Sequence, residues 1–355
     1  MVYFTHVGSA HYKEFQVSKT MIAIMGSGPL GLWTADALVG EANSADIFLR
    51  IGNTRGKAPM WLPANLARSV AAGLVEWKAI DALDAGSVRE FAAGSKALVH
   101  CVNPLYHEWA SKLPIIQGNA IAAALAAKVR LICADNLYSY AAPVHGPLTE
   151  AQPENPPSRK GGIRRDMHGL LRQSQAAAGL AWATVQASDY FGPGAGSQSF
   201  FGDRFIDPTL QGKQAQFIGN PNLRHSWAYA PDFGRALALL ATTQQESLLN
   251  RYWILPHVSH QPAAIMAQAF FKELDQQGIL PATSSRTTGR LPRWLLRFAS
   301  LFNPFIREVD EMLYQFLMDF EASGAAFSLA SGLQPTKLET AIAETVDFWK
   351  QTKLH

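Results

Sequence analysis

Short apolar runs alternate with longer stretches of helical periodicity through the first half of the chain. The apolar runs have the length of buried strands and fall at 21–25, 46–51, 74–77, 96–102, 129–134 and 181–187. Helices are predicted between them at 29–41, 62–72, 86–93, 109–127 and 163–178. This alternation is typical of a parallel sheet with helices on both faces. We therefore predict an α/β fold with a doubly wound parallel sheet.

The turn after the first strand has the glycine spacing of a dinucleotide-binding site. Gly26 would make the tight turn, Gly28 would let the backbone approach a pyrophosphate, and Gly31 would let the next helix pack close to the sheet. The start of that helix offers N–H groups to the phosphates. The predicted cofactor-binding turn is Gly26-Ser27-Gly28-Pro29-Leu30-Gly31. A structural turn in another α/β protein is the alternative interpretation.

The second half of the chain has a less regular pattern, which predicts a smaller C-terminal lobe. Helices are predicted near 231–242, 261–275, 291–302, 307–319 and 336–351, with a strand at 252–255. We divide the chain into an N-terminal extension (1–19), a dinucleotide-binding domain (20–195) and a mainly substrate-binding lobe (196–355), some of whose elements return to the core sheet. The proline-rich loop at 141–159 is long, which suggests a functional role.

The loop after the second strand bears on the choice of cofactor. An NAD site usually places Asp or Glu there, but this chain has Gly52 and Asn53. Arg50, Arg55 and Lys57 are nearby, and basic side chains can pair with a 2′-phosphate. We predict NADP as the cofactor, bound with Asn53 and Arg55, and keep NAD as the alternative. A solvated basic loop would have the same sequence.

Composition and charge narrow the classes of function. The chain has 355 residues, is 48% hydrophobic and carries a net charge of +3, which gives no indication of nucleic-acid binding. Cys101 and Cys133 fall in predicted core strands and are interpreted as buried thiols, with a disulfide left open. No CxxC motif or histidine cluster indicates a metal site.

The sequence gives no indication of a secretory signal or an integral membrane segment, so we expect a cytoplasmic protein with a small-molecule substrate. The basic amphipathic segment at 290–302 would suit peripheral contact with an anionic membrane or a lipid-like substrate. A core-facing helix whose arginines extend toward solvent explains the same pattern.

These features resemble the extended and atypical short-chain dehydrogenase/reductase superfamily, in its NAD(P)-dependent epimerase and dehydratase branch. The resemblance covers roughly 20–350 and is carried by Gly26–Gly31, Asp81, Pro147–Glu150, Asp189–Pro193 and Tyr229–Asp232. It implies the NAD(P)-binding Rossmann fold. It also implies that Asp81 contacts the adenine and that Asp189, Tyr190 and Phe191 lie on the nicotinamide side.

The catalytic motifs depart from that pattern. Asn136 stands where the superfamily keeps a catalytic Ser or Thr, and the region of its Tyr-x-x-x-Lys motif, near 158–164, has no tyrosine. The resemblance to an atypical subgroup that uses a lysine there implies a catalytic role for Lys160. Tyr138 and Tyr140 are the other candidate acids, and their spacing would put one toward the cleft and one toward the core. Asn136 could only position a substrate, and Lys160 could instead pair with a phosphate.

The strand at 96–102 ends at Asn103 and Pro104, in a turn that would lie over the cofactor at the carboxyl edge of the sheet. Tyr106 and His107 follow this turn and are candidate substrate-binding residues. In the second lobe, the candidates for substrate binding are His225 and Trp227.

The leading functional prediction is an atypical NADP-dependent reductase of a carbonyl-containing, fairly apolar small molecule. The many aromatic residues after 300 favour an apolar pocket. The first alternative is an NAD-dependent sugar-nucleotide epimerase or dehydratase. The second is a cofactor-sensing protein that uses the fold without turnover, which the missing tyrosine would favour.

Overall fold

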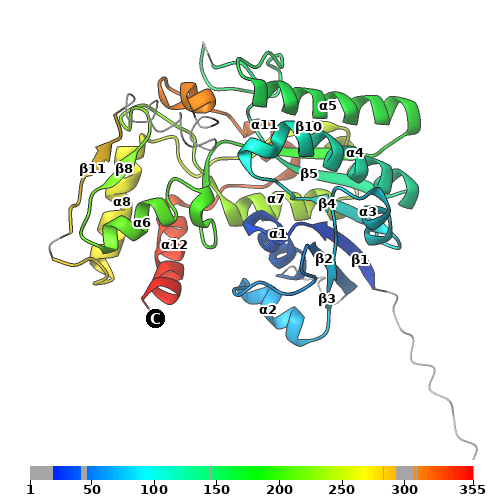
Figure 1. The fold of residues 1–355 in the computed structure, drawn as a ribbon, viewed down its shortest axis with the longest axis horizontal. Coiled ribbons are helices and arrows are strands. Elements are labelled where there is room, and N and C mark those ends of the chain that lie inside the picture. Colours follow the sequence, from blue (N-terminus) through cyan, green and yellow to red (C-terminus); the bar gives the residue numbers. More distant parts are fainter. Residues whose placement is uncertain are drawn as a thin grey trace, which may run out of the picture.

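A parallel sheet forms the centre of the protein (Figure 1). The computed structural model describes residues 19–40, 46–143, 145–282, 284–292, 308 and 310–354. Within these residues the main sheet has seven strands in the order β10-β6-β5-β4-β1-β2-β3, and all neighbouring strands are parallel. The predicted doubly wound sheet is therefore confirmed. Its strands are β1 (Thr20–Met25), β2 (Ile47–Asn53), β3 (Val75–Ala79), β4 (Ala97–His100), β5 (Arg130–Asn136), β6 (Trp182–Ala187) and β10 (Arg251–Ile254).

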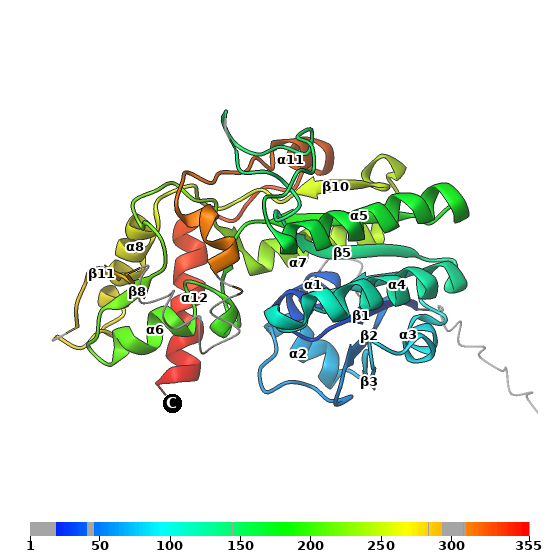
Figure 2. The same cartoon turned by 45° about the horizontal axis from the view of Figure 1, so that its top comes forward.

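Helices cover both faces of this sheet (Figure 2). One face packs against α1 (Pro29–Gly40), α2 (Ala64–Ala71) and α7 (Ala230–Thr242), and the other packs against α3 (Ala85–Ala92), α4 (Trp109–Ala127) and α5 (Arg159–Ala178). Successive residues of a strand point to opposite faces. In β1, Ile22 and Ile24 therefore join the core under α1 and α7, whereas Ala23 and Met25 join the core under α3 and α4. The strands are apolar throughout because both faces are buried.

The order of the strands reverses between β1 and β4. From β1 the chain proceeds outward to β2 and β3, and from β4 it proceeds to β5 and β6 on the other side. In open α/β sheets, ligands bind at the carboxyl edge where the order reverses. The glycine turn after β1 and the segment after β4 meet at this point, since a Cβ on Gly26 would lie 3.0 Å from the carbonyl of Cys101.

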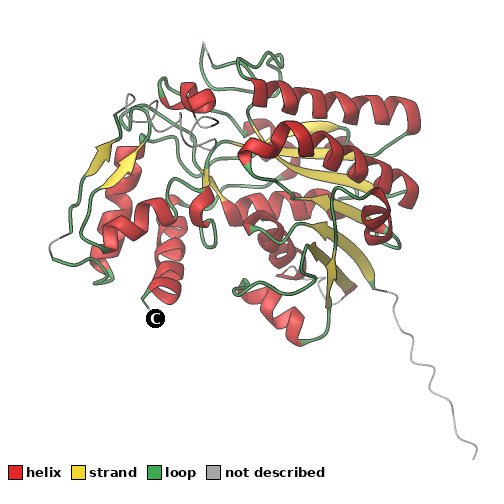
Figure 3. Cartoon of the chain, viewed as in Figure 1, coloured by secondary structure: helices red, strands yellow, loops and turns green. Residues whose placement is uncertain are grey.

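A smaller lobe lies beside the sheet (Figure 3). Its helices α6 (Asp203–Leu210), α8 (Ala263–Gln276) and α12 (Leu338–Lys353) enclose an aromatic core that includes Phe201, Phe270 and Trp349. Two short parallel pairs of strands complete it, β8 (Ala215–Phe217) with β11 (Thr288–Arg290) and β7 (Tyr190–Phe191) with β9 (Ala228–Tyr229). The helix α11 (Ala325–Ser331) packs against β10 instead, with Phe327 beside Trp253.

Most predicted elements agree with the structure within a few residues, but α5 does not. It begins at Arg159, four residues before the predicted start at 163, because the Ser158 hydroxyl caps it by accepting a hydrogen bond from the Gly161 N–H at 3.0 Å. The predictions missed α6, α11 and the four short strands of the lobe. Of the helix predicted at 307–319, Glu308 and 310–312 are helical and a 3₁₀ turn follows at Leu313–Phe316.

Nearly all of the basic segment at 290–302 lies outside the described residues. Among the described residues, no helix has both the length and the apolar character that crossing a membrane requires.

Candidate functional site

The glycine turn has the geometry that a dinucleotide requires. Gly26 has a φ of +109°, a conformation that favours glycine. A Cβ on Gly31 would lie 2.0 Å from the carbonyl oxygen of Gly26, so only glycine lets α1 begin this close to the turn. At Gly28, by contrast, a Cβ would meet no atom within 4 Å, which leaves the backbone open to a ligand. The first N–H groups of a helix have no acceptor within the helix, so the start of α1 beside this open space fits a pyrophosphate.

The loop after β2 is organised around Asn53. Its amide nitrogen donates hydrogen bonds to the Ser27 hydroxyl at 3.0 Å and to the Lys57 carbonyl at 2.8 Å, and its amide oxygen accepts one from the Arg55 N–H at 3.0 Å. Asn53 therefore ties this loop to the glycine turn. Arg55 and Lys57 are exposed beside it. Arg50 is not available to a 2′-phosphate, which corrects its expected role, because its guanidinium pairs with Glu76 at 2.7 Å.

Pro29 is the first residue of α1, and the side chain of Leu30 packs against the core. Asp81 is exposed at the same edge, just after β3, and its carboxylate accepts a hydrogen bond from the Leu83 N–H at 2.9 Å. Whether Asp81 reaches an adenine stays a prediction.

The segment after β4 forms one wall of the site. Asn103 is exposed, and its side-chain oxygen accepts a hydrogen bond from Arg164 at 3.1 Å. The Pro104 carbonyl accepts one from the Trp109 indole at 3.1 Å, which fixes the turn against the start of α4. His107 lies in the following 3₁₀ turn and is exposed.

Tyr106, in the 3₁₀ turn after β4, and Tyr138, just after β5, form a hydrogen-bonded pair of hydroxyls. Burial raises the pKa of both phenols well above the ordinary value, so both are neutral near pH 7. Tyr140 points the other way and lies in the core, where its hydroxyl donates to Gln186 at 3.1 Å. This placement removes Tyr140 from the candidate catalytic residues. Asn136 accepts a hydrogen bond from the Tyr138 N–H at 3.0 Å, so it shapes the turn that carries Tyr138.

Lys160 does not present a free ammonium group. Its side chain is 1% exposed, and its ammonium pairs with Glu308 and, at 3.0 Å, with Glu311. Two carboxylates therefore balance its charge, which argues against the expected role of proton donor. Sequence reasoning could not find these partners, because they lie 148 and 151 residues further along the chain.

A buried ionic network that the sequence analysis missed lies below the site. Arg164 and His168 follow Lys160 at intervals of four residues, so the three side chains share one face of α5. Asp135 at the end of β5 pairs with Arg164 at 3.1 Å and with His168 at 2.6 Å. The other ring nitrogen of His168 contacts Glu154 in the proline-rich loop.

The electrostatics of this network follow from its contacts. Burial alone would lower the pKa of His168, but the hydrogen bonds to Asp135 and Glu154 outweigh it and raise that pKa. His100 and Arg164 line the same small cavity. His100 is buried and forms no ion pair with a carboxylate of the described residues, and burial lowers its pKa to about 4.

Asp189 follows β6 and reaches the lobe. Its carboxylate lies 2.8 Å from the Nε2 of His225, and the Ser188 hydroxyl lies 3.1 Å from the same nitrogen. Tyr190 donates a hydrogen bond to Gln198 at 3.0 Å. Phe191 is fully buried in the aromatic core of the lobe, so its side chain cannot contact a cofactor as expected.

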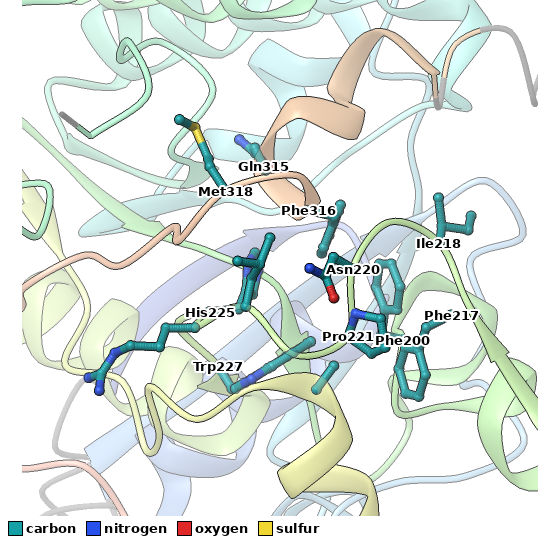
Figure 4. Close-up of a pocket in the computed structure, with 13 residues that line it drawn as sticks. Phe200, Phe217, Ile218, Asn220, Pro221, His225, Trp227, Gln315, Phe316 and Met318 are labelled. Atoms are coloured by element: carbon teal, nitrogen blue, oxygen red, sulfur yellow. The ribbon is translucent and has the colours of Figure 1, made fainter. Parts of the chain in front are cut away.

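His225 and Trp227 line an aromatic pocket in the lobe (Figure 4). The ring of His225 stacks on the ring of Phe316, with the two centroids 4.8 Å apart. The ring of Phe200 contacts the same Phe316 ring, with the centroids 4.6 Å apart. The polar side chains of Asn220 and Gln315 also line the pocket, beside its aromatic rings. The lining residues are Phe200, Phe217, Ile218, Asn220, Pro221, Leu223, Arg224, His225, Trp227, Ala263, Gln315, Phe316 and Met318.

Comparisons with known proteins give matches only at the level of structure. No family model and no curated protein matches the chain. A dTDP-glucose 4,6-dehydratase from Streptomyces venezuelae, solved with NAD bound, superposes with a TM-score of 0.72 at 16% identity, over 94% of this chain and 98% of that chain.

Two epimerases superpose over a similar extent. The UDP-glucuronic acid 4-epimerase from Bacillus cereus, in complex with NAD, gives a TM-score of 0.70 at 13% identity, over 94% of this chain and 99% of that chain. The UDP-glucose 4-epimerase from Thermotoga maritima gives a TM-score of 0.69 at 15% identity, over 94% of this chain and 100% of that chain. The chain thus shares the complete fold of these dehydratases and epimerases, sheet and lobe together, which is the fold that its sequence resemblance implied.

Proposed function

We propose that this chain is a nicotinamide-dinucleotide-dependent enzyme that acts on a hydroxyl- or carbonyl-bearing carbon of a nucleotide-linked sugar. The observation that carries the proposal is a shared edge: the glycine turn, the Tyr106–Tyr138 pair and Asp189 all follow carboxyl ends of the same parallel sheet. The dTDP-glucose dehydratase and the UDP-glucuronic acid epimerase were solved with NAD, and the UDP-glucose epimerase was solved with UDP-glucose. These structural neighbours act on dTDP- or UDP-linked sugars, which supports this substrate class.

The residues that would hold the cofactor are the turn from Gly26 to Gly31, the loop around Asn53, and Asp81. When bound, a nicotinamide dinucleotide exchanges a hydride with the substrate carbon. The lobe pocket would hold the planar base of the substrate, with the rings of Phe200 and Phe316 as stacking surfaces.

The second candidate is an NADP-dependent reductase of an apolar carbonyl compound. The mostly apolar lining of the lobe pocket favours it. The loop after β2 also favours NADP, because it has no acidic residue beside the exposed Arg55 and Lys57.

The test begins with the purified protein. Bound nucleotide is released by acid and identified, and NAD, NADH, NADP and NADPH are titrated by protein fluorescence. Turnover is then measured with UDP- and dTDP-sugars and, separately, with apolar aldehydes and ketones. The matched control is Gly28→Ala, which places a methyl group in the open space of the turn.

Conversion of a nucleotide sugar that the control variant loses would support the proposal. Turnover only with apolar carbonyl compounds would favour the reductase. Cofactor binding without turnover would favour a cofactor-sensing protein, and absence of binding to all four nucleotides would exclude every dinucleotide-dependent function.

A further inference from the structure

The reacting end of a bound dinucleotide would lie over the carboxyl ends of β4, β5 and β6. The strand order reverses between β1 and β4, and a dinucleotide held at the glycine turn would cross the sheet there. Its adenosine half would then lie toward β2 and β3, and its other half toward β4, β5 and β6. Three polar side chains follow these strands, Tyr106 after β4, Tyr138 after β5 and Asp189 after β6. The hydroxyls of Tyr106 and Tyr138 share a hydrogen bond, and the carboxylate of Asp189 helps to raise the pKa of both phenols.

The two phenol rings are held firmly. Tyr106 and Tyr138 meet edge to face with their ring centroids 6.4 Å apart, and their hydroxyls share a hydrogen bond. Trp109 contacts both rings, at 4.8 Å and 5.9 Å between centroids. The ammonium of Lys160 lies 5.1 Å from the ring of Tyr106, on which it makes a cation–π contact. A hydroxyl pair this well fixed has the preorganisation that a group acting on a reacting oxygen needs.

Other polar groups near this point are less suited to proton transfer. Lys160 is neutralised by Glu308 and Glu311, and Tyr140 lies in the core. The amide of Asn136 cannot exchange a proton at neutral pH. His225 is 4% exposed, and its Nε2 already faces Asp189 and Ser188.

We propose, on the basis of the function proposed above, that Tyr106 is the proton-exchanging residue of this site and that Tyr138 positions it and stabilises its ionised form by donating a hydrogen bond. Tyr106 lies in the 3₁₀ turn that follows β4, and Tyr138 lies just after β5, so neither comes from α5. The assignment gives a role to the one hydroxyl pair that the described residues place at this edge.

In the direction of reduction, the carbonyl carbon would receive a hydride, which a bound nicotinamide dinucleotide would supply, and the π electrons of the C=O bond would move to the oxygen. The O–H bond of Tyr106 breaks and its proton joins that oxygen, which leaves a phenolate. Tyr138 then donates its hydrogen bond to this phenolate, and water returns the proton to Tyr106. In the oxidation direction, the same phenolate accepts the proton of the substrate hydroxyl.

The surrounding charges support this division of roles. Burial and the carboxylate of Asp189 raise the pKa of Tyr106, whereas the hydrogen bond with Tyr138 and the charge of Arg164 act to lower it. The same hydrogen bond raises the pKa of Tyr138. The shared hydrogen bond therefore acts on the two pKa values in opposite directions, which agrees with the proposed roles of Tyr138 as donor and Tyr106 as acceptor.

The experiment compares Tyr106→Phe and Tyr138→Phe with the unsubstituted protein, using the nucleotide sugar or carbonyl compound that it converts. Tyr106→Phe should lower kcat by roughly 10²–10⁴-fold, the usual contribution of general acid–base catalysis. Tyr138→Phe should lower kcat by roughly 10–100-fold, as expected for loss of one hydrogen bond to a charged group. It should also leave the KM of the substrate nearly unchanged, because Tyr138 acts through Tyr106 and does not bind the substrate.

Two readouts do not depend on turnover. Cofactor affinity, measured by fluorescence, should be unchanged in both variants. The proton NMR spectrum of the cofactor-free protein should contain a downfield hydroxyl resonance that both variants lose. Tyr140→Phe, from the same stretch of chain, is the matched control and should keep this resonance, the kcat and the KM of the substrate.

The outcomes separate the two proposals. If Tyr106→Phe retains the kcat of the unsubstituted protein, the assignment of Tyr106 is overturned while the proposed function stands. If Tyr138→Phe raises the KM of the substrate and leaves kcat unchanged, its positioning role is overturned. If the unsubstituted protein converts no substrate, the proposed function fails and this inference fails with it.

Discussion

The ammonium of Lys160 lies 3.0 Å from the carboxylate of Glu311, and this pair joins the start of α5 to the segment that precedes the 3₁₀ turn at Leu313–Phe316. The backbone N–H of Lys160 donates a hydrogen bond to the same Glu311 carboxylate at 2.9 Å. With Glu308 as a second partner, the buried ammonium is surrounded by anions. Lys160 therefore anchors the wall of the site behind Tyr106, and its charge serves the structure rather than the reaction.

Replacing this lysine should change stability more than chemistry. We expect Lys160→Met to lower the free energy of unfolding by about 1–3 kcal/mol, because Glu308 and Glu311 lose their shared partner in a largely buried place. Denaturant unfolding measures this change. Lys112→Met is the control, since Lys112 pairs with Glu108 on the surface of α4, and it should cost less than about 1 kcal/mol. Full stability combined with lost turnover would restore the interpretation of Lys160 as a proton donor.

Two glycines of the same turn should respond in opposite ways. Gly31→Ala should lower the free energy of unfolding by about 1–3 kcal/mol, because the new methyl group would overlap the Gly26 carbonyl. Gly28→Ala should leave stability within about 0.5 kcal/mol, because its methyl group enters open space, and should weaken cofactor binding instead. Thermal unfolding and fluorescence titration of both variants check this. Equal cofactor affinity in Gly28→Ala and the unsubstituted protein would contradict a pyrophosphate at this turn.

The parallel sheet and the glycine turn could be predicted because local signals determine them. Strands buried on both faces are continuously apolar, as in β1, and the glycines at 26 and 31 are each required by contacts within a few residues or with the adjacent strand. The short strands of the lobe were missed because they have only two or three residues, too few to show a period.

The side-chain partners of the site could not be predicted, because they come from distant parts of the chain. Lys160 has carboxylate neighbours about 150 residues later, and Arg50 has Glu76 on the adjacent strand rather than a place in the loop that follows it. The spacing of Lys160, Arg164 and His168 did contain a signal. It indicates a polar stripe on one face of α5, and a polar stripe facing a sheet needs buried partners.

Arg55 offers a test of cofactor preference. If it reads a 2′-phosphate, Arg55→Ala should weaken NADPH binding by about 1.5–3 kcal/mol, roughly 10–150-fold, and leave NADH binding unchanged. Fluorescence titrations of both nucleotides measure the difference. The exposed Arg89 on α3 is the control, and Arg89→Ala should affect neither. An equal loss for both nucleotides, or no loss for either, would show that Arg55 does not read this phosphate.

His168 should make the stability of the protein depend on pH. Its pKa is raised in the folded protein by Asp135 and Glu154, so the folded protein binds this proton more tightly than the unfolded chain does. The resulting stabilisation is fully present below the unfolded pKa of about 6.5 and is lost as the pH rises through the higher folded pKa. At pH 6, His168→Gln should therefore be less stable than the unsubstituted protein by about 1.5–3 kcal/mol.

The comparison between pH 6 and pH 9 isolates this histidine. His100 and His257 are buried with pKa values lowered to about 4 and 3, so their contribution has the opposite sign and falls below pH 6.5. Both histidines are present in His168→Gln and in the unsubstituted protein, so their contributions cancel in the stability difference between the two. The stability gap between His168→Gln and the unsubstituted protein, measured by denaturant unfolding, should narrow as the pH rises. The exposed His107 is the control, and His107→Gln should show a gap near zero at every pH. A gap for His168→Gln that widens toward pH 9 would mean that the ring is neutral in the folded protein and that Asp135 and Glu154 do not share a cation.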